Sequence, residues 1–296
     1  MLAPELAEEL HYIEINASRR IRSTRFGQSR SPLRGSGYEF ETHRKYQIGE
    51  DFRRIDWNVS ARMQEIFLKR HFEEKEVNVF LLIDVSRSMQ FSTAKYSKRL
   101  RVLQVAASLG FSAVSDACNF GYLAFSDKVE AFEPARKGRG HVWKSLENIY
   151  DLKPKSEGTN WEVALRFLRS QLRSMSIVFL LSDFVSDPDV PQLADLPDLK
   201  ILAQKHDVVP IIFGDMIENN LPVGRGLLRF RSAEGRREMV LSLSSAQRRT
   251  FDALIERRRT DLRELFFSLG MECLFLNVGD EFMDPLMTLF ERRRKV

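Results

Sequence analysis

Residues 77–89 have the sequence VNVFLLIDVSRSM, and this stretch decides the fold. An almost continuous apolar run that ends in an acidic residue predicts a β-strand covered on both faces. Five later stretches rich in apolar residues also predict strands, at residues 120–125, 128–134, 176–183, 208–214 and 271–278. Longer amphipathic segments lie between them and predict helices over about 95–117, 139–150, 160–174, 190–206, 245–269 and 281–294. This alternation predicts a doubly wound α/β fold with a mostly parallel, six-stranded sheet.

Two connections refine this prediction. Only Ser126 and Asp127 join the second and third strands, which is too short for a parallel crossover, so we expect one antiparallel edge strand. Residues from about 226 to 243, with Glu234 and Gly235 at the turn, predict an inserted β-hairpin. We therefore expect a main domain over residues 77–296 that carries this hairpin.

An N-terminal region, residues 1–76, precedes the main domain. Residues 2–22 place Leu2, Leu6, Leu10, Ile13 and Ala17 on one face, which predicts an amphipathic helix. A segment from Ser18 to Gly37 follows, with six arginines and no acidic residue among serine, glycine and proline, and it predicts a basic loop.

Composition bounds the function. With 296 residues and 43% hydrophobic content the chain can bury a sizeable core, and a net charge of +5 with charged residues of both signs argues against a nucleic-acid partner. Cys118 and Cys273 each lie in an apolar run without a second cysteine nearby, so we expect buried thiols. The first ten residues do not resemble a signal peptide, and no apolar run approaches the roughly 20 residues of a membrane span. We expect a cytoplasmic protein, with peripheral membrane contact left open.

The chemistry is concentrated where the buried strands end. Asp84, Ser86 and Ser88 form a D-x-S-x-S pattern after the first strand, at the sheet edge where α/β proteins bind ligands. Thr159 lies in a loop that opens a helix, and Asp183 ends another buried strand. Three hydroxyls and two carboxylates are hard oxygen donors, which favour Mg²⁺ or Mn²⁺ over zinc. The alternative is that these side chains only cap helices and turns.

The same five residues resemble the adhesion site of the von Willebrand factor A family, which has a D-x-S-x-S motif, a distant threonine and a distant aspartate. The resemblance implies that the first and fourth strands lie side by side and that Asp84, Ser86, Ser88, Thr159 and Asp183 hold one metal ion. It also implies that an acidic side chain from a partner completes the coordination of the ion.

A block of residues upstream of the first strand points to a narrower family within this resemblance. Residues 46–57 have the sequence YQIGEDFRRIDW, followed by Ser60, Ala61 and Arg62. This block resembles the signature of the bacterial domain-of-unknown-function family fifty-eight, which precedes a von Willebrand A domain. Members are typically encoded beside MoxR-type AAA+ ATPases, which implies a chaperone-like or metal-insertion partnership with such an ATPase.

The resemblance assigns no role to the signature residues, which are Gly49, Asp51, Arg54, Asp56, Trp57 and Arg62. From their chemistry, Gly49 permits a sharp turn, Asp51 can cap a short helix, and Trp57 offers a large packing anchor. Two roles stay open for the block: a structural buttress, and a docking surface for the ATPase.

Our leading hypothesis is a non-enzymatic adaptor whose metal captures an acidic side chain of a MoxR-type ATPase or of a client protein. The sequence has no phosphate-binding G-x-x-x-x-G-K-S/T motif, so ATP hydrolysis is expected in the partner. One alternative is a Mg²⁺-dependent phosphatase-like enzyme, although Ser86 stands where a second catalytic aspartate would be needed. Another is nucleic-acid binding through the arginine runs at 257–259 and 292–295, which neighbouring acidic residues partly neutralise.

Overall fold

The structure is a computed structural model that describes residues 2–20, 39–47, 50–72, 77–90, 97–156, 158–185, 193–215, 218, 226–231, 238–242 and 244–294. It divides into two compact units. The larger unit consists of Met1–Gly27 and Val77–Val296, and the smaller one is Gln28–Glu76. Each unit is described by itself.

The larger unit is built on a six-stranded sheet in the order β10-β7-β6-β3-β4-β5. The strands are β3 (Asn78–Asp84), β4 (Asn119–Phe125), β5 (Val129–Arg136), β6 (Ser176–Ser182), β7 (Asp207–Gly214) and β10 (Leu274–Asn277). Only the edge strand β5 pairs antiparallel within this sheet, and the other neighbours are parallel. The predicted fold class, with its antiparallel edge strand, is therefore confirmed.

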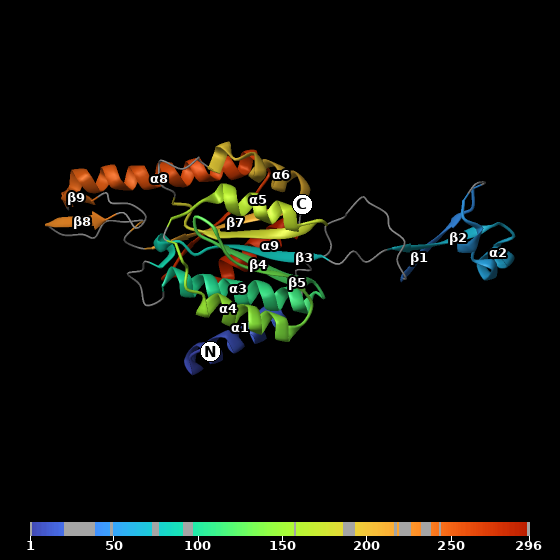
Figure 1. Ribbon diagram of the computed structural model, residues 1–296. Coiled ribbons are helices and arrows are strands. Elements are labelled where there is room, and N and C mark those ends of the chain that lie inside the picture. The colour runs from blue at the N-terminus through green and yellow to red at the C-terminus, as the bar shows by residue number, and fades with distance from the viewer. Residues whose placement is uncertain are drawn as a thin grey trace. The chain divides into compact units, whose positions relative to one another are not determined.

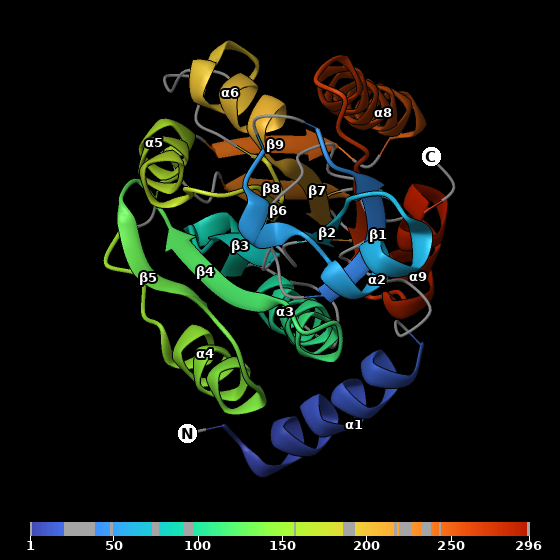
Figure 2. The same ribbon diagram turned by 90° about the vertical axis from the view of Figure 1, so that its right-hand side faces the viewer.

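Helices cover both faces of the sheet (Figures 1 and 2). One face carries α1 (Pro4–Arg20), α3 (Lys98–Ser115), α4 (Arg139–Asp151) and α9 (Met283–Arg294). The other face carries α5 (Trp161–Gln171), α6 (Pro197–Lys205) and α8 (Ser245–Ser268). Short 3₁₀ helices occupy Arg87–Gln90 (η3) and Leu193–Asp195 (η4).

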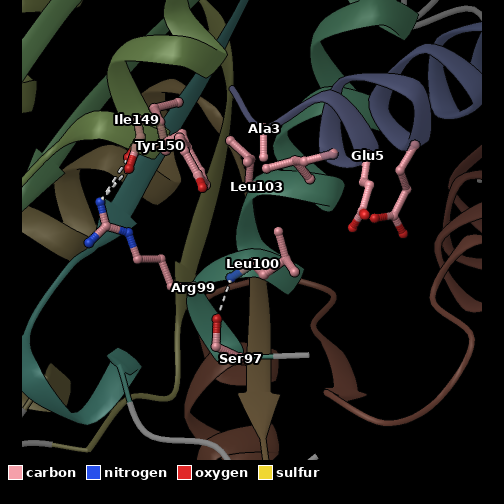
Figure 3. A pocket seen from close by; sticks show the side chains of 10 residues that line it. Ala3, Glu5, Ser97, Arg99, Leu100, Leu103, Ile149 and Tyr150 are labelled. Carbon is pink, nitrogen blue, oxygen red and sulfur yellow. Dashed lines mark hydrogen bonds between the residues drawn. The ribbon is translucent and has the colours of Figure 1, made fainter. Parts of the chain in front are cut away.

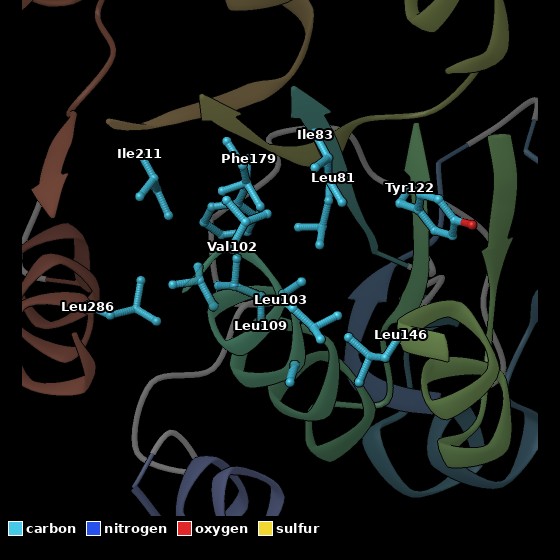
Figure 4. Packing of buried hydrophobic residues seen from close by; sticks show 14 of the residues in the cluster. Leu81, Ile83, Val102, Leu103, Leu109, Tyr122, Leu146, Phe179, Ile211 and Leu286 are labelled. Carbon is cyan, nitrogen blue, oxygen red and sulfur yellow. The ribbon is translucent and has the colours of Figure 1, made fainter. Parts of the chain in front are cut away.

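The core is split by the sheet into two clusters. Because side chains alternate along a strand, Leu81 and Ile83 of β3 pack with α3 and α9, whereas Phe80 and Leu82 pack with α5 and α6. Figure 4 shows the first cluster, in which Leu286 of α9 joins the residues of the sheet and α3. All four of these β3 side chains are at most 2% exposed, as the unbroken apolar run predicts.

The first helix belongs to the larger unit. Leu6, Leu10, Ile13 and Ala17 are all buried, and α1 packs along α3. An ion pair between Glu14 of α1 and Arg139 ties the helix to α4 as well. The amphipathic face was predicted correctly, but the structure groups this helix with the sheet rather than with the rest of residues 1–76.

Three smaller predictions concern this unit. The inserted hairpin is present as β8 (Leu227–Arg231) paired antiparallel with β9 (Glu238–Ser242), and its expected turn residues lie outside the described ones. Cys118 is buried as expected, whereas Cys273 is only half-buried. No described helix is both long and apolar enough to cross a membrane.

The smaller unit is a two-stranded antiparallel ribbon with two short helical segments. Strands β1 (Glu39–Lys45) and β2 (Phe67–Phe72) pair, and between them lie η2 (Phe52–Arg54) and α2 (Trp57–Met63). The sequence did not predict these strands. Most of the predicted basic loop, from residue 21 onward, lies outside the described residues, and Ser18–Arg20 form the end of α1.

Candidate metal centre

Two neighbouring parallel strands bring the acidic residues together. Ile83 of β3 pairs with Leu181 of β6, so Asp84 and Asp183 leave the sheet at the same edge. Ser86 and Ser88 follow Asp84 in the turn that opens η3. This side-by-side placement of the first and fourth strands confirms the strand order expected from the resemblance, and it puts four of the predicted ligands at one switch point of the sheet.

The four side chains form one connected, buried network. The Ser86 N–H donates to Asp84 Oδ1 at 2.9 Å, and the Ser86 and Ser88 hydroxyl oxygens are 3.1 Å apart. Ser88 Oγ donates to Asp183 Oδ1 at 3.2 Å. None of the four residues is more than 5% exposed. A hydroxyl that gives its hydrogen to a carboxylate keeps its oxygen lone pairs free, which is the arrangement a cation needs.

Thr159 lies on a separate loop. It is 3% exposed and precedes Asn160, whose N–H donates to the Ser126 carbonyl at 2.9 Å and whose side chain caps α5. Two residues on, the Trp161 ring stacks against Phe184, with centroids 4.9 Å apart. The start of α5 is thus packed against the residue that follows Asp183.

Burial and a neighbouring carboxylate shift the titration of Asp84. Burial, and then the neighbouring carboxylate of Asp183, raise the pKa of Asp84 from 3.8 to about 7. Hydrogen bonds from Ser182 and Ser86 oppose this rise. Ser182 Oγ donates to Asp84 Oδ2 at 2.5 Å and accepts from the Phe184 N–H at 2.8 Å. Ser182 is a residue that the sequence reasoning missed, although it stands beside Asp183 at the end of an otherwise apolar strand.

The residue after Asp183 has an unusual backbone conformation. Phe184 has a φ of +55°, in the left-handed region that a bulky side chain rarely adopts. Its ring is held between Trp161 and Phe266 of α8, and its N–H is bonded to Ser182. Residues kept in such conformations by their surroundings cluster at functional sites.

A lysine that the sequence reasoning did not single out enters this network. Lys98 Nζ lies 2.8 Å from Asp183 Oδ2 and 2.6 Å from Glu218 Oε1, and its side chain is fully buried. Burial alone would lower the pKa of Lys98, but Asp183 and Glu218 outweigh it and hold the pKa above 10.5. The Glu218 side chain is 34% exposed and lies at the rim.

The arginine run 257–259 also differs from expectation. Arg258 donates to the Asp183 carbonyl oxygen at 2.8 Å, and Arg259 pairs with Glu256 at 3.3 Å. In the other run Arg293 pairs with Asp207. These arginines therefore have partners within the chain, which weakens the nucleic-acid alternative.

The donor set fits a hard divalent cation. Carboxylate and hydroxyl oxygens of Asp84, Ser86, Ser88 and Asp183 lie in one buried network at this edge, and such oxygens are the ligands that Mg²⁺ and Mn²⁺ prefer. Among the described residues, no group of three or more His, Cys, Asp or Glu side chains is arranged to hold a metal, so a zinc-type cluster is absent from that part of the chain.

A separate pocket lies away from these residues. A cavity of about 420 Å³ opens between α1, α3 and α4, and Arg99 on its wall donates to the Tyr150 carbonyl at 2.9 Å (Figure 3). None of its lining residues belongs to the predicted ligand set. The pocket therefore does not form part of the candidate metal centre.

The signature block lies in the smaller unit. Asp51 accepts from the Arg53 N–H and caps η2 as predicted, and Asp56 accepts from the N–H groups of Asn58 and Val59 and caps α2. Trp57 is 66% exposed, so the packing role expected for it is not seen in this unit. Arg62 is exposed in the last turn of α2, Gly49 lies outside the described residues, and only the backbone of Arg54 is described.

Bacterial proteins are among those similar to this chain. The chain is 26% identical over 295 residues to an uncharacterized protein of Mycobacterium tuberculosis, an alignment that covers 99% of this chain and 91% of that protein. It is also 27% identical to the uncharacterized protein YeaD of Bacillus subtilis, over 36% of this chain and 24% of that protein.

Among solved structures, BatB from Bacteroides thetaiotaomicron is similar with a TM-score of 0.44 and 13% identity, over 74% of this chain and all of that one. A mussel byssus matrix protein, described with a zinc-occupied MIDAS motif, is similar with a TM-score of 0.33 and 20% identity, over 47% of this chain and 38% of that one. Neither likeness is strong enough to carry an argument about function. The model of the family described as protein of unknown function DUF58 matches residues 42–261, and the chain belongs to this family.

Proposed function

We propose that this protein is a non-catalytic adaptor that holds Mg²⁺ or Mn²⁺ and uses the ion to bind an acidic side chain of a partner. The ligands would be Asp84, Ser86, Ser88, Thr159 and Asp183. The observation that carries the proposal is the buried hydrogen-bonded network in which Ser88 joins the turn after Asp84 to the carboxylate of Asp183.

The chemistry follows from the kinds of ligand. When bound, the ion would supply a Lewis-acidic position for an incoming carboxylate, because neutral hydroxyl ligands leave its charge under-compensated. The residues of this chain orient and bury the site: Ser86 and Ser88 present hydroxyl oxygens, and Ser182 holds the carboxylate of Asp84.

We propose a MoxR-type AAA+ ATPase as the partner, with chaperone-like work or metal insertion as the shared task. This part rests on the family resemblance alone. We propose that the adaptor works in the cytoplasm, where an ATPase finds its nucleotide, and that the basic segments supply any peripheral contact with a membrane.

The metal assignment is tested by melting the protein in EDTA and in increasing MgCl₂ or MnCl₂. A ligand present at 100 times its dissociation constant stabilises the folded state by about 2.7 kcal/mol. We expect this stabilisation in the wild type and not in Asp84→Ala. Asp252→Ala, on the exposed surface of α8, is the matched control and should behave as the wild type. Metal stabilisation that survives in Asp84→Ala would refute the assignment.

The partner is tested by capture of the purified MoxR-type ATPase on immobilised wild type, Asp84→Ala and Ser86→Ala, with MgCl₂ or with EDTA. Metal-dependent capture by the wild type alone is expected. Equal capture in all conditions would refute a metal bridge, and no capture at all would refute this choice of partner.

A further inference from the structure

The candidate metal centre contains a positive charge of its own. Lys98, in the first turn of α3, is 0% exposed and donates to three acceptors: Asp183 Oδ2 at 2.8 Å, Glu218 Oε1 at 2.6 Å and the Ser88 carbonyl at 3.4 Å. Two of these acceptors belong to residues of the proposed ligand set. A buried ammonium requires such partners, because an unpaired charge in the interior is costly.

Lys98 binds one carboxylate oxygen of Asp183, which is also a proposed metal ligand. Asp183 Oδ2 accepts from Lys98, while Oδ1 accepts from Ser88 and from the Val185 N–H at 3.1 Å. An ion bound through Oδ1 would lie within a few ångströms of the ammonium. Two cations at that distance repel each other strongly in a water-poor site.

The ion pair also reaches the rim. Glu218 lies 120 residues from Lys98 in the sequence, and its other carboxylate oxygen accepts from the Asp215 N–H at 3.1 Å. Its charge partly offsets that of Lys98, which pairs with the carboxylates of both Asp183 and Glu218. Removing Lys98 makes the metal centre more negative, whereas removing the charge of Glu218 makes it more positive.

We infer that Lys98 is an internal counter-cation that holds Asp183 in place without metal and lowers the affinity of the centre for a divalent ion. This inference rests on the proposed metal site. It gives Lys98, which is not one of the proposed ligands, the role of positioning Asp183 and setting the affinity for the metal. The competing role is simple support, in which Lys98 orients Asp183 and its removal weakens metal binding. The two roles predict opposite changes in metal affinity when Lys98 is removed: tighter binding for a counter-cation and weaker binding for simple support.

The experiment is a calorimetric titration of the metal-free full-length protein with MgCl₂, and separately with MnCl₂, at pH 8. Lys98→Met should bind about tenfold more tightly than the wild type, a difference of about 1.4 kcal/mol. Glu218→Gln should bind more weakly, because it removes a negative charge and leaves the Asp183 carboxylate to pair with Lys98. Lys144→Met, an exposed lysine of α4, is the matched control and should not change the affinity.

Melting curves in EDTA provide a second measurement. Lys98→Met should melt at a lower temperature than the wild type without metal, and added Mg²⁺ should raise its melting temperature by more than it raises that of the wild type. Equal or weaker metal binding by Lys98→Met would overturn the inference. If that variant does not fold, Glu218→Gln decides, and unchanged or tighter binding there would overturn it. Failure of the wild type to bind either metal would refute the proposed site itself.

Discussion

Replacing Ser182 with alanine should destabilise the larger unit, because two buried hydrogen bonds depend on its hydroxyl. Ser182 Oγ donates to Asp84 Oδ2 and accepts from the N–H of Phe184. Asp84, with a pKa of about 7, is partly protonated near neutral pH, so its bond lies between the neutral and the charged kind. Such a bond contributes about 1–2 kcal/mol, and the stranded Phe184 N–H costs about 1–3 kcal/mol.

These two effects are not fully additive, and we expect a loss of about 2–4 kcal/mol in the free energy of unfolding. For a domain of this size that corresponds to a fall of roughly 4–16 °C in melting temperature. The measurement is urea unfolding followed by circular dichroism, in EDTA so that metal does not contribute. Ser170→Ala is the matched control, because its hydroxyl bonds the Phe167 carbonyl on the exposed surface of α5. A Ser182→Ala loss within about 0.5 kcal/mol of this control would refute the reasoning.

Two further predictions concern packing and pH. Gly121→Ala should cost about 1–3 kcal/mol, because the new Cβ would lie 2.7 Å from a backbone nitrogen of β5, whereas Gly140→Ala in α4 meets nothing within 4 Å and should be neutral or stabilising in the same urea assay. Burial, and then Lys205, lower the pKa of His206 below 6.5, so the folded protein binds this proton less readily than the unfolded chain. The wild type should therefore lose stability relative to His206→Gln as the pH falls below about 6.5, and parallel pH profiles of the two proteins would contradict this.

The sheet could be predicted from the sequence because its central strands β3, β4, β6 and β7 are buried on both faces. Runs such as FLLI in β3 and IVFLL in β6 have no polar residue to confuse a strand with a surface helix. Three helix starts are marked by capping residues, because Ser97, Asn160 and Ser244 each accept a backbone N–H. Helices α4 and α6 have no side-chain cap, and α6 begins at Pro197, later than the predicted start near residue 190.

The smaller unit could not be predicted in the same way. Strand β1 has the sequence EFETHRK and β2 has FLKRHF, and a short, charged ribbon of this kind has no run of apolar residues to mark it. In the smaller unit, the sequence indicated only a helix cap. Asp51 was predicted to begin a short helix and does so, whereas the second cap at Asp56 was not foreseen.

In the candidate metal centre, the aspartates and serines could be found because each stands where a strand ends or in the turn directly after it. Lys98 could not be found in this way. A lysine in the first turn of an amphipathic helix is normally solvated, and its burial depends on Glu218 and Asp183, which lie 120 and 85 residues away in the chain. The contact of Arg258 with Asp183 could not be found either, because these residues are far apart in the chain and the arginine run suggests a solvated helix face.

Asp183 is the point at which these long-range contacts meet. Its two carboxylate oxygens accept from Ser88, Val185 and Lys98, and its carbonyl accepts from Arg258 of α8. An aspartate held by donors from several elements is in position before any ion arrives, so little ordering remains to oppose metal binding. The same contacts connect the position of Asp183 to α3 through Lys98 and to α8 through Arg258. Under the proposed metal binding, an ion that drew this carboxylate toward itself would disturb contacts with α3 on one face of the sheet and α8 on the other.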